Sequence, residues 1–133
     1  MDRHPLNLLL RFALEVAALV VLGRWGWGLL PGWHGAIPGL LVPVAAGAVW
    51  GIFRVPDDGG RPVVSVSGPV RLLLEVAFFT AAVWAAYATG DGRWAAPLGT
   101  LVSIHYALSW RRVDRLARNQ PLPASFPQGR PRA

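Results

Sequence analysis

Four long apolar stretches, separated by shorter polar segments, dominate the pattern of the chain. At a rise of about 1.5 Å per residue, apolar helices of about 17 to 25 residues match the ~30 Å hydrocarbon core of a bilayer. The stretches cover roughly residues 6–30, 36–53, 69–90 and 94–110. The pattern predicts an all-α fold, namely an integral membrane four-helix bundle that crosses the bilayer with multiple passes.

The polar segments between the stretches differ in length. Residues 29–35 and 90–93 are short and contain glycine, which is typical of tight turns. Residues 54–68 form a longer linker, for which we expect no regular secondary structure. We expect Asp57 and Asp58 in this linker to be solvated. Two short turns on either side of one longer linker predict two tandem two-helix hairpins.

The same charged motif opens the first and the third apolar stretch. Arg11 precedes Glu15 by four residues, and Arg71 precedes Glu75 by four residues, sixty positions later. An ionisable side chain near the bilayer centre costs about 2.5 to 3.5 kcal/mol on insertion scales, and such residues are usually paired or functional. We therefore expect each charged side chain of the two motifs either to pair with another residue or to serve a function.

The offset of sixty residues also aligns the second stretch with the fourth, matching Gly39 with Gly99 and Trp50 with Trp110. We interpret this as an internal repeat of a two-helix unit. Because each unit has two spans, both copies enter the membrane in the same direction and are related by an axis along the membrane normal. The repeat places the first and the third helix in equivalent positions.

The order of the charges within each motif bears on how they pair. Arginine four residues before glutamate is the poorer order for an ion pair within one helix. We therefore predict that the pairs are exchanged across the axis, Arg11 with Glu75 and Arg71 with Glu15. This pairing requires the first and the third helix to be neighbours.

A histidine in the fourth stretch lies at about the depth of the charged motifs. We expect this residue, His105, to form a hydrogen bond with Tyr106, Ser109 or a carboxylate. The alternative is a proton relay, since histidine titrates near physiological pH. The predicted intramembrane polar cluster consists of Arg11, Glu15, Arg71, Glu75 and His105.

Two interpretations of the cluster remain open. It is either a buried polar clamp that fixes the register of the helices, or a proton or cation path with a protonatable glutamate. An arginine one turn away favours the ionised carboxylate and opposes proton uptake near neutral pH. The sequence therefore favours the clamp.

Composition agrees with a membrane protein: 53% of the residues are hydrophobic and 15% are charged. The net charge is +6, all 13 basic residues are arginine, and there is no cysteine. Much of the excess charge follows the last apolar stretch, which favours anionic lipid as the partner. No motif that alternates aromatic and basic residues supports nucleic-acid binding, so we expect no nucleic-acid partner.

The distribution of arginine predicts the orientation in the membrane. By the positive-inside rule, the segments richer in arginine lie in the cytoplasm, which places both termini there. We divide the chain into a four-span domain, residues 1–118, and a disordered Arg/Pro-rich cytoplasmic tail, residues 119–133. Residues 111–118 are expected to extend the fourth helix along the surface. The arginines counted on the cytoplasmic side are Arg3, Arg54, Arg61, Arg111, Arg112, Arg115, Arg118, Arg130 and Arg132, against Arg24 and Arg93 on the other side.

No pattern in the chain indicates catalysis. There is no glycine-rich phosphate loop, no Ser/His/Asp or Cys/His set at plausible spacing, and no group of metal ligands. We therefore expect no enzyme activity, no catalytic residues, no cofactor and no metal site.

Several segments carry a resemblance to a known family. They are the run from Asn7 through Arg11 to Glu15, residues 50–56 (WGIFRVP), and Arg71 with Glu75 followed by Phe78. Over about residues 6–110 the chain resembles the YrdB family of small bacterial membrane proteins. The resemblance implies four transmembrane helices and the bacterial inner membrane, and it implies no substrate. The small multidrug resistance family also has four helices and a glutamate in the first, but its members lack the second Arg-Glu pair.

The sequence thus predicts a structural or accessory membrane protein whose Arg/Glu group stabilises the bundle. The alternative is a small proton- or cation-coupled transporter that uses Glu15 or Glu75. A homo-oligomer or a second membrane protein would suit the first function.

Overall fold

The computed structural model describes residues 4–58, 61–90 and 92–123. Within these residues the protein is all-α, with a short 3-10 helix η1 (Gly32–Gly35) and one small pair of strands. Each of the four stretches expected to be helical forms a helix, with ends within about one turn of those expected. The five α-helices are α1 (Pro5–Trp27), α2 (Ala36–Ile52), α3 (Gly68–Ala88), α4 (Gly92–Leu108) and α5 (Trp110–Ala117).

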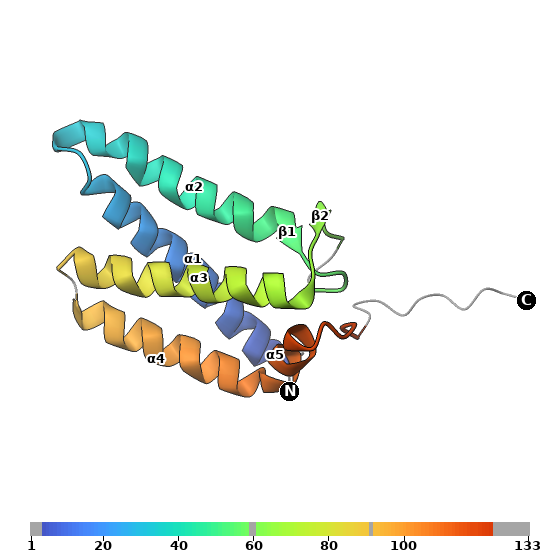
Figure 1. Ribbon diagram of the computed structural model, residues 1–133. Coiled ribbons are helices and arrows are strands. Elements are labelled where there is room, and N and C mark those ends of the chain that lie inside the picture. Colours follow the sequence, from blue (N-terminus) through green and yellow to red (C-terminus); the bar gives the residue numbers. More distant parts are fainter. Residues whose placement is uncertain (1–3, 59–60, 91, 124–133) are drawn as a thin grey trace, which may run out of the picture.

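Helices α1 and α3 lie at the centre of the arrangement. Helix α1 packs along α2, α3 packs along α4, and α1 also contacts α3 and α4 (Figure 1). The chain thus forms two helical hairpins that meet through their first helices. The α1–α2 and α3–α4 turns lie at one end of the molecule, and the described start of α1, the linker and α5 lie at the other.

The apolar core lies where α1, α3 and α4 meet. Leu14, Ala18 and Leu22 of α1 pack with Phe79 and Ala82 of α3. The three side chains from α1 follow one another at intervals of four residues, so they share one helix face. Small alanines in α3 allow that face to approach closely. The opposite faces of the helices remain outside the core.

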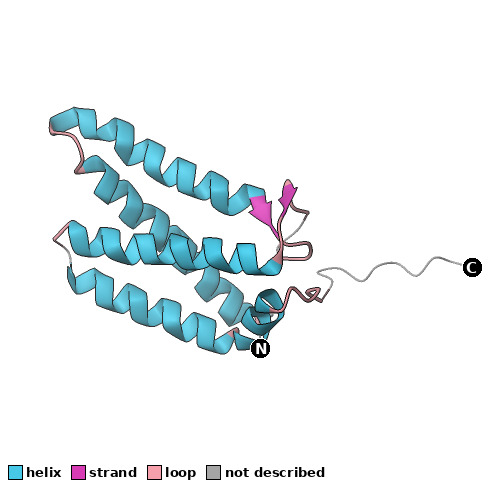
Figure 2. Ribbon diagram, viewed as in Figure 1, coloured by secondary structure: helices cyan, strands magenta, loops and turns pink. Residues whose placement is uncertain are grey.

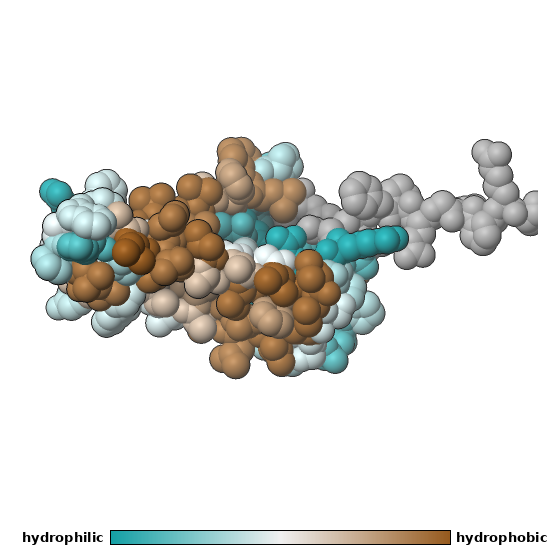
Figure 3. Space-filling view, turned by 90° about the horizontal axis from the view of Figure 1, so that it is seen from above, coloured by the Kyte–Doolittle hydropathy of each residue, from teal (hydrophilic) through white to brown (hydrophobic). Residues whose placement is uncertain are grey.

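Much of the outer surface is apolar. Leu9 and Phe12 of α1, Leu40 of α2 and Leu73 of α3 are each more than half exposed. Figure 3 shows hydrophobic side chains over much of one face, with pale and teal side chains at its left end and further teal side chains toward its right. Among the described residues, the segments that are long and apolar enough to cross a membrane are Pro5–Trp27, Gly32–Ile52 and Gly68–Ala88. Such a surface suits lipid rather than water.

The α1–α2 hairpin is held at backbone contact by glycine. A Cβ on Gly26 would clash with the carbonyl of Pro38, and a Cβ on Gly35 would clash with the carbonyl of Trp27. Small residues at such positions let membrane helices approach closely and gain dispersion energy. This hairpin therefore depends on these glycines for its packing.

The central linker is more ordered than the sequence suggested. Strands β1 (Phe53–Arg54) and β2 (Val64–Ser65) form a parallel pair at the end of the bundle (Figure 2). Our expectation of no secondary structure here was wrong. The expectation that both aspartates are solvated was also wrong for Asp58, which is buried, because arginines from two helices surround it.

Residues 111–118 do not extend the fourth helix along the surface. The chain bends at Ser109, and α5 folds back against α3 with Arg112 and Leu116 buried. A Cβ on Gly68 would clash with the carbonyl of Leu116, and the backbone N–H of Gly68 donates to Asn119 Oδ1 at 2.8 Å. The described part of the predicted tail thus caps the start of α3. Residues 124–133, the rest of that tail, lie outside the described residues.

Candidate functional site

Charged side chains gather at the end of the bundle where the linker and α5 lie. They come from four separate segments: α1, the linker, α3 and α5. We call this group the charged cluster; it consists of Arg11, Glu15, Asp58, Arg71, Glu75 and Arg112.

In both sequence motifs, the arginine forms an ion pair with the glutamate of its own helix. Arg11 Nε lies 3.0 Å from Glu15 Oε1, and Arg71 Nε lies 3.1 Å from Glu75 Oε1. The predicted exchange between helices is present in one direction only, because Arg11 Nη2 lies 3.9 Å from Glu75 Oε1. No ion pair joins Arg71 to Glu15 among the described residues. The prediction of two exchanged pairs was therefore wrong for Arg71, although α1 and α3 are neighbours as it required.

Arg71 is directed instead toward the end of α2. Its Nη1 donates to the backbone carbonyls of Trp50 at 2.8 Å and Phe53 at 2.6 Å. These belong to the end of a helix, where the last carbonyls have no partner within the helix. The guanidinium also lies over the Trp50 ring, 4.2 Å from its centroid. Arg71 thus fastens the second helix to the third, with its side chain 1% exposed.

Arg112 bridges two buried carboxylates. Its Nε and Nη2 donate to Asp58 at 3.1 and 2.5 Å, and its Nη1 and Nη2 donate to Glu75 at 3.0 and 2.5 Å. Bidentate arginine–carboxylate pairs are among the stronger hydrogen-bonded contacts in proteins. Through one side chain, α5 is joined to both the linker and α3.

Asp58 and Arg112 were not among the residues singled out from the sequence. The two arginines and two glutamates of the repeated motif already balance, so no charge count required a further pair. The spacing of Arg112 and Leu116 was the one available signal, because residues four apart share a helix face. Leu116 is apolar and is buried in the structure, so the helix face that it shares with Arg112 could have been expected to pack against the bundle.

The charged cluster is electrically balanced, with three arginines and three carboxylates. Charges are buried in proteins at an acceptable cost only when they are paired and hydrogen-bonded. Burial alone would raise the pKa of Asp58, but hydrogen bonds from Arg112 and the charges of Arg11 and Arg112 outweigh it and hold that pKa below its ordinary value. Asp58 is therefore ionised at neutral pH.

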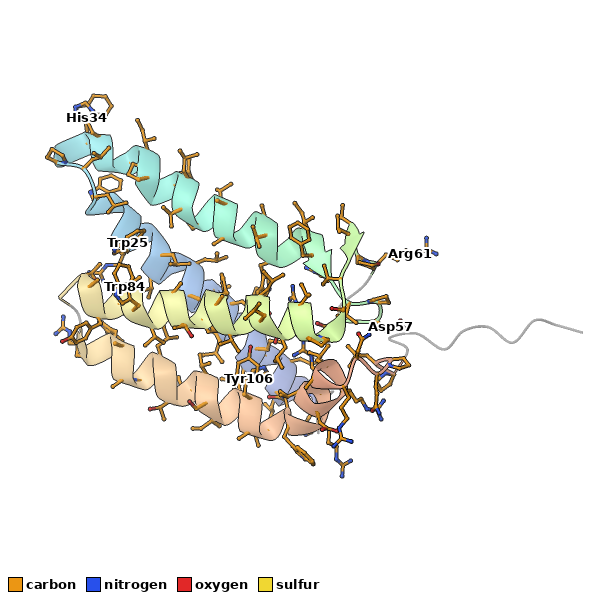
Figure 4. All side chains as sticks on the ribbon, in the orientation of Figure 1. Trp25, His34, Asp57, Arg61, Trp84 and Tyr106 are labelled. Atoms are coloured by element: carbon orange, nitrogen blue, oxygen red, sulfur yellow. The ribbon has the colours of Figure 1, made fainter. Side chains whose placement is uncertain are left out.

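A second set of polar contacts adjoins the charged cluster. Tyr106 of α4 donates through its hydroxyl to Glu75 Oε2 at 3.0 Å, and Figure 4 shows this side chain between α4 and α3. The predicted site residue His105 does not join the carboxylates. Its Nδ1 lies 3.0 Å from Asn7 Oδ1, and Asn7 Nδ2 donates to Ser109 Oγ at 2.8 Å. The two polar networks both fasten α4 to its neighbours.

The arrangement offers few ligands for a metal. Within the described residues, no group of three or more histidine, cysteine, aspartate or glutamate side chains could hold a metal ion. His34 lies at the end of the molecule opposite Asp57 and Arg61 (Figure 4). The carboxylates of the charged cluster already form ion pairs with arginine.

Comparison with known proteins agrees with the motifs described above. Residues 9–103 match the family described as a protein of unknown function, DUF2568. The chain belongs to this family. It is also 37% identical over 113 residues to the uncharacterized protein YrdB of Bacillus subtilis (strain 168), an alignment that covers 83% of this chain and 92% of that relative. No solved structure matches the chain.

Family membership confirms the resemblance noted from the motifs. The matched residues contain both Arg-Glu motifs and Asp58, whereas α5 with Arg112 follows the matched region. Three helical segments fit to cross a membrane and a bacterial relative indicate a membrane protein. No activity comes with the family description.

Proposed function

We propose that the protein is a non-enzymatic, structural or accessory protein of the bacterial inner membrane, in which the charged cluster clamps a four-span bundle. The bridge from Arg112 to Asp58 and Glu75 is the observation that carries this proposal. It joins the linker, α3 and α5, three segments that are separate in the sequence, through one side chain. The clamp holds the linker and α5 against the two hairpins.

Four spans are supported by the resemblance of α4 to α2. Each has 17 residues, about 26 Å of helix, and each turns apolar side chains outward. Leu101, Ile104 and Leu108 of α4 are exposed. In a soluble protein such a face would need a cover, whereas lipid satisfies it directly. With four spans, both ends of the bundle domain lie on the same side of the membrane.

The charged cluster marks the cytoplasmic side. Arg54, Arg61, Arg111, Arg115 and Arg118 all lie in the linker or near α5, and the positive-inside rule favours the cytoplasm for that end. Of the arginines expected to contact anionic lipid, Arg112 is buried, while Arg111, Arg115 and Arg118 are exposed and suit such a contact.

The geometry of Glu75 favours a clamp over a proton carrier. Its carboxylate accepts hydrogen bonds from Arg71, Arg112 and Tyr106, and the residue is 1% exposed. A carrier must release and take up a proton during each cycle, and paired arginines oppose the neutral form. Glu75 therefore suits a permanent charge.

The alternative is a small proton- or cation-coupled transporter, and Glu15 is the residue that favours it. Its side chain is 22% exposed, and among the described residues its ion pair is with Arg11. Such a carboxylate has room to exchange a proton or to contact a cation. Transport through Glu15 is thus the second candidate function.

Proton flux in liposomes and thermal unfolding in detergent separate the two functions. For a clamp we expect wild-type flux at the level of empty liposomes under imposed pH, Na⁺ and K⁺ gradients, and a clear loss of stability in Glu75→Gln. A stoichiometric membrane protein that copurifies would identify the accessory role. Wild-type flux that is abolished in a stably folded Glu15→Gln variant would overturn the proposal in favour of the transporter.

A further inference from the structure

Helix α5 combines a buried face with an exposed, positively charged face. The buried face carries Arg112 and Leu116 and packs against α3. The exposed face carries three arginines, which share one side because their spacing follows the turn of an α-helix. They are Arg111, Arg115 and Arg118, and we call them the arginine face. At about 3.6 residues per turn the two faces lie about 110° apart around the helix axis, so the arginine face is directed sideways from the bundle.

The arginine face begins where the exposed apolar surface of α4 ends. Leu108, the last residue of α4, is 43% exposed, and Trp110, the first residue of α5, is 62% exposed. Tryptophan rings prefer the interface between the hydrocarbon and the water. With this end of the bundle on the cytoplasmic side, as proposed above, α5 lies at the level of the headgroups of the cytoplasmic leaflet.

The charge of the arginine face is only partly balanced within α5. Arg118 forms an ion pair with Asp114 at 2.8 Å, and Asp114 is the one acidic residue of this helix. Arg115 Nη1 donates to the carbonyl oxygen of Pro121 at 3.4 Å, a neutral acceptor. Three exposed arginines against one aspartate give this side of α5 an excess of positive charge. Phosphate groups accept charge-assisted hydrogen bonds from arginine, so an anionic headgroup complements this side.

The position of the arginine face is fixed relative to the bundle. The backbone N–H of Gly68, where α3 begins, donates to Asn119 Oδ1 at 2.8 Å, directly after α5. From its buried face, α5 is also joined to Asp58 and Glu75 through Arg112. The same helix therefore presents three arginines to the leaflet and one arginine to the charged cluster.

We propose that the arginine face of α5 docks on anionic phospholipid headgroups of the cytoplasmic leaflet, and that this contact holds α5 closed over the charged cluster. The inference rests on the clamp and on the membrane orientation proposed above. A ligand that binds one conformation stabilises that conformation. Anionic lipid is thus a ligand of the closed bundle, and by the reciprocity of linked equilibria the closed clamp also favours binding of the lipid.

A membrane leaflet fits this face better than an acidic soluble protein. The exposed Trp110 and Leu108 adjoin the arginine face, and both suit contact with lipid. Headgroups are therefore within reach of the three arginines whenever the bundle lies in the membrane. A soluble partner would first have to displace them.

Hydrogen exchange of the full chain in lipid nanodiscs tests this coupling. Nanodiscs of phosphatidylcholine alone are compared with nanodiscs that also contain phosphatidylglycerol, and mass spectrometry follows the backbone amides of α5. We expect these amides to exchange at least about fivefold more slowly with phosphatidylglycerol, since one arginine near a membrane surface contributes about 1 kcal/mol, or about fivefold in an equilibrium. Salt at about 1 M, where the screening length is about 3 Å, should remove most of this difference.

Three variants assign the effect to the arginine face. Arg115→Gln should lose about fivefold of the slowing, whereas Arg115→Lys keeps the charge and should retain it. Arg61→Gln is the matched control and should behave as the wild type. Arg61 is exposed and lies at the same end of the bundle, but it belongs to the linker and not to α5 (Figure 4).

Several results would overturn the inference. Equal losses in Arg115→Gln and Arg61→Gln would mean that positive charge at this end attracts lipid without a contact specific to α5. Loss of the slowing in Arg115→Lys would mean that charge is not its cause. An acidic protein that copurifies with the wild type but not with Arg115→Gln, without any effect of phosphatidylglycerol, would assign the face to a protein partner.

The same measurement separates the lipid contact from the clamp. Amides of α5 that are protected equally in both kinds of nanodisc would refute the lipid contact and leave the clamp in place. Amides of α5 that exchange freely in both would refute the clamp itself, because α5 would then not be held against the bundle.

Discussion

Removing Arg112 should destabilise the protein far more than removing an exposed arginine from the same helix. In Arg112→Gln, the two buried carboxylates lose a partner that donates to both of them. Breaking a buried ion pair from one side typically costs 3 to 5 kcal/mol, because it leaves a buried charge uncompensated. Here Asp58 keeps Arg11, and Glu75 keeps Arg71 and Tyr106. We therefore expect a loss near the lower limit, about 3 kcal/mol in the free energy of unfolding.

The chain offers a matched control for this prediction. Arg118 also lies at α5 and also forms an ion pair, with Asp114 at 2.8 Å, but its side chain is 67% exposed. Exposed ion pairs of this spacing contribute about 0.3 to 0.5 kcal/mol. Arg118→Gln removes the same charge and should therefore leave stability nearly unchanged.

Reversible unfolding in detergent, followed by circular dichroism, measures both variants and a double-mutant cycle with Glu75→Gln. The double variant loses one charge of each sign, so its destabilisation should fall short of the sum of the two single losses by at least about 1 kcal/mol. Equal stability of Arg112→Gln and Arg118→Gln within about 0.5 kcal/mol would refute the clamp. Additive single losses would show that Arg112 and Glu75 act independently.

Three further predictions concern the same end of the bundle. Because the pKa of Asp58 is lower in the folded than in the unfolded protein, its charged form stabilises the fold fully above its unfolded pKa of about 3.9, and this stabilisation is lost as the pH falls below that value. Acid unfolding should show the loss of stability, and Asp58→Asn should abolish this pH dependence. Gly68→Ala should cost about 1 to 3 kcal/mol, because a methyl group there clashes with the backbone of α5, whereas Gly99→Ala should be tolerated; melting temperatures compare the two. Tyr106→Phe should cost about 1 kcal/mol or less by the same measurement, because one hydrogen bond to Glu75 is lost while both arginines remain; a larger loss would show that the hydroxyl does more than donate to this carboxylate.

The helices of the hairpins could be predicted from the sequence because a membrane helix satisfies its own backbone hydrogen bonds. Their apolar stretches therefore specify helices without knowledge of the neighbours. Arg11 and Glu15 were found in the same way, since a charge within an apolar run is visible in the sequence alone. The small 3-10 helix and the turn that contains Gly90 likewise lie where glycine indicated a change of direction.

The linker and α5 could not be predicted in this way, because distant partners determine their positions. Asp58 lies in a segment whose composition suggests solvated loop, and only contacts with Arg11 and Arg112 make its burial favourable. Arg112 lies among other arginines in a short helix of mixed charge, where periodicity distinguishes it weakly. Contacts between residues 58 and 112 depend on the completed bundle. Local sequence therefore carries little information about them.

The repeated motif illustrates how similar sequences come to serve different contacts. Arg11 and Arg71 each pair with the glutamate four residues later. In addition, Arg71 binds the end of α2, whereas Arg11 binds Asp58 in the linker after α2. An ideal two-fold arrangement would give Arg11 the corresponding contact at the end of α4. That place is taken by Asn7, which joins His105 and Ser109 at the bend before α5. The bend lets α5 turn inward, and its arginine then supplies the third positive charge that balances Asp58. The departure from symmetry and the burial of Arg112 are thus parts of one arrangement, in which α5 closes the end of the bundle.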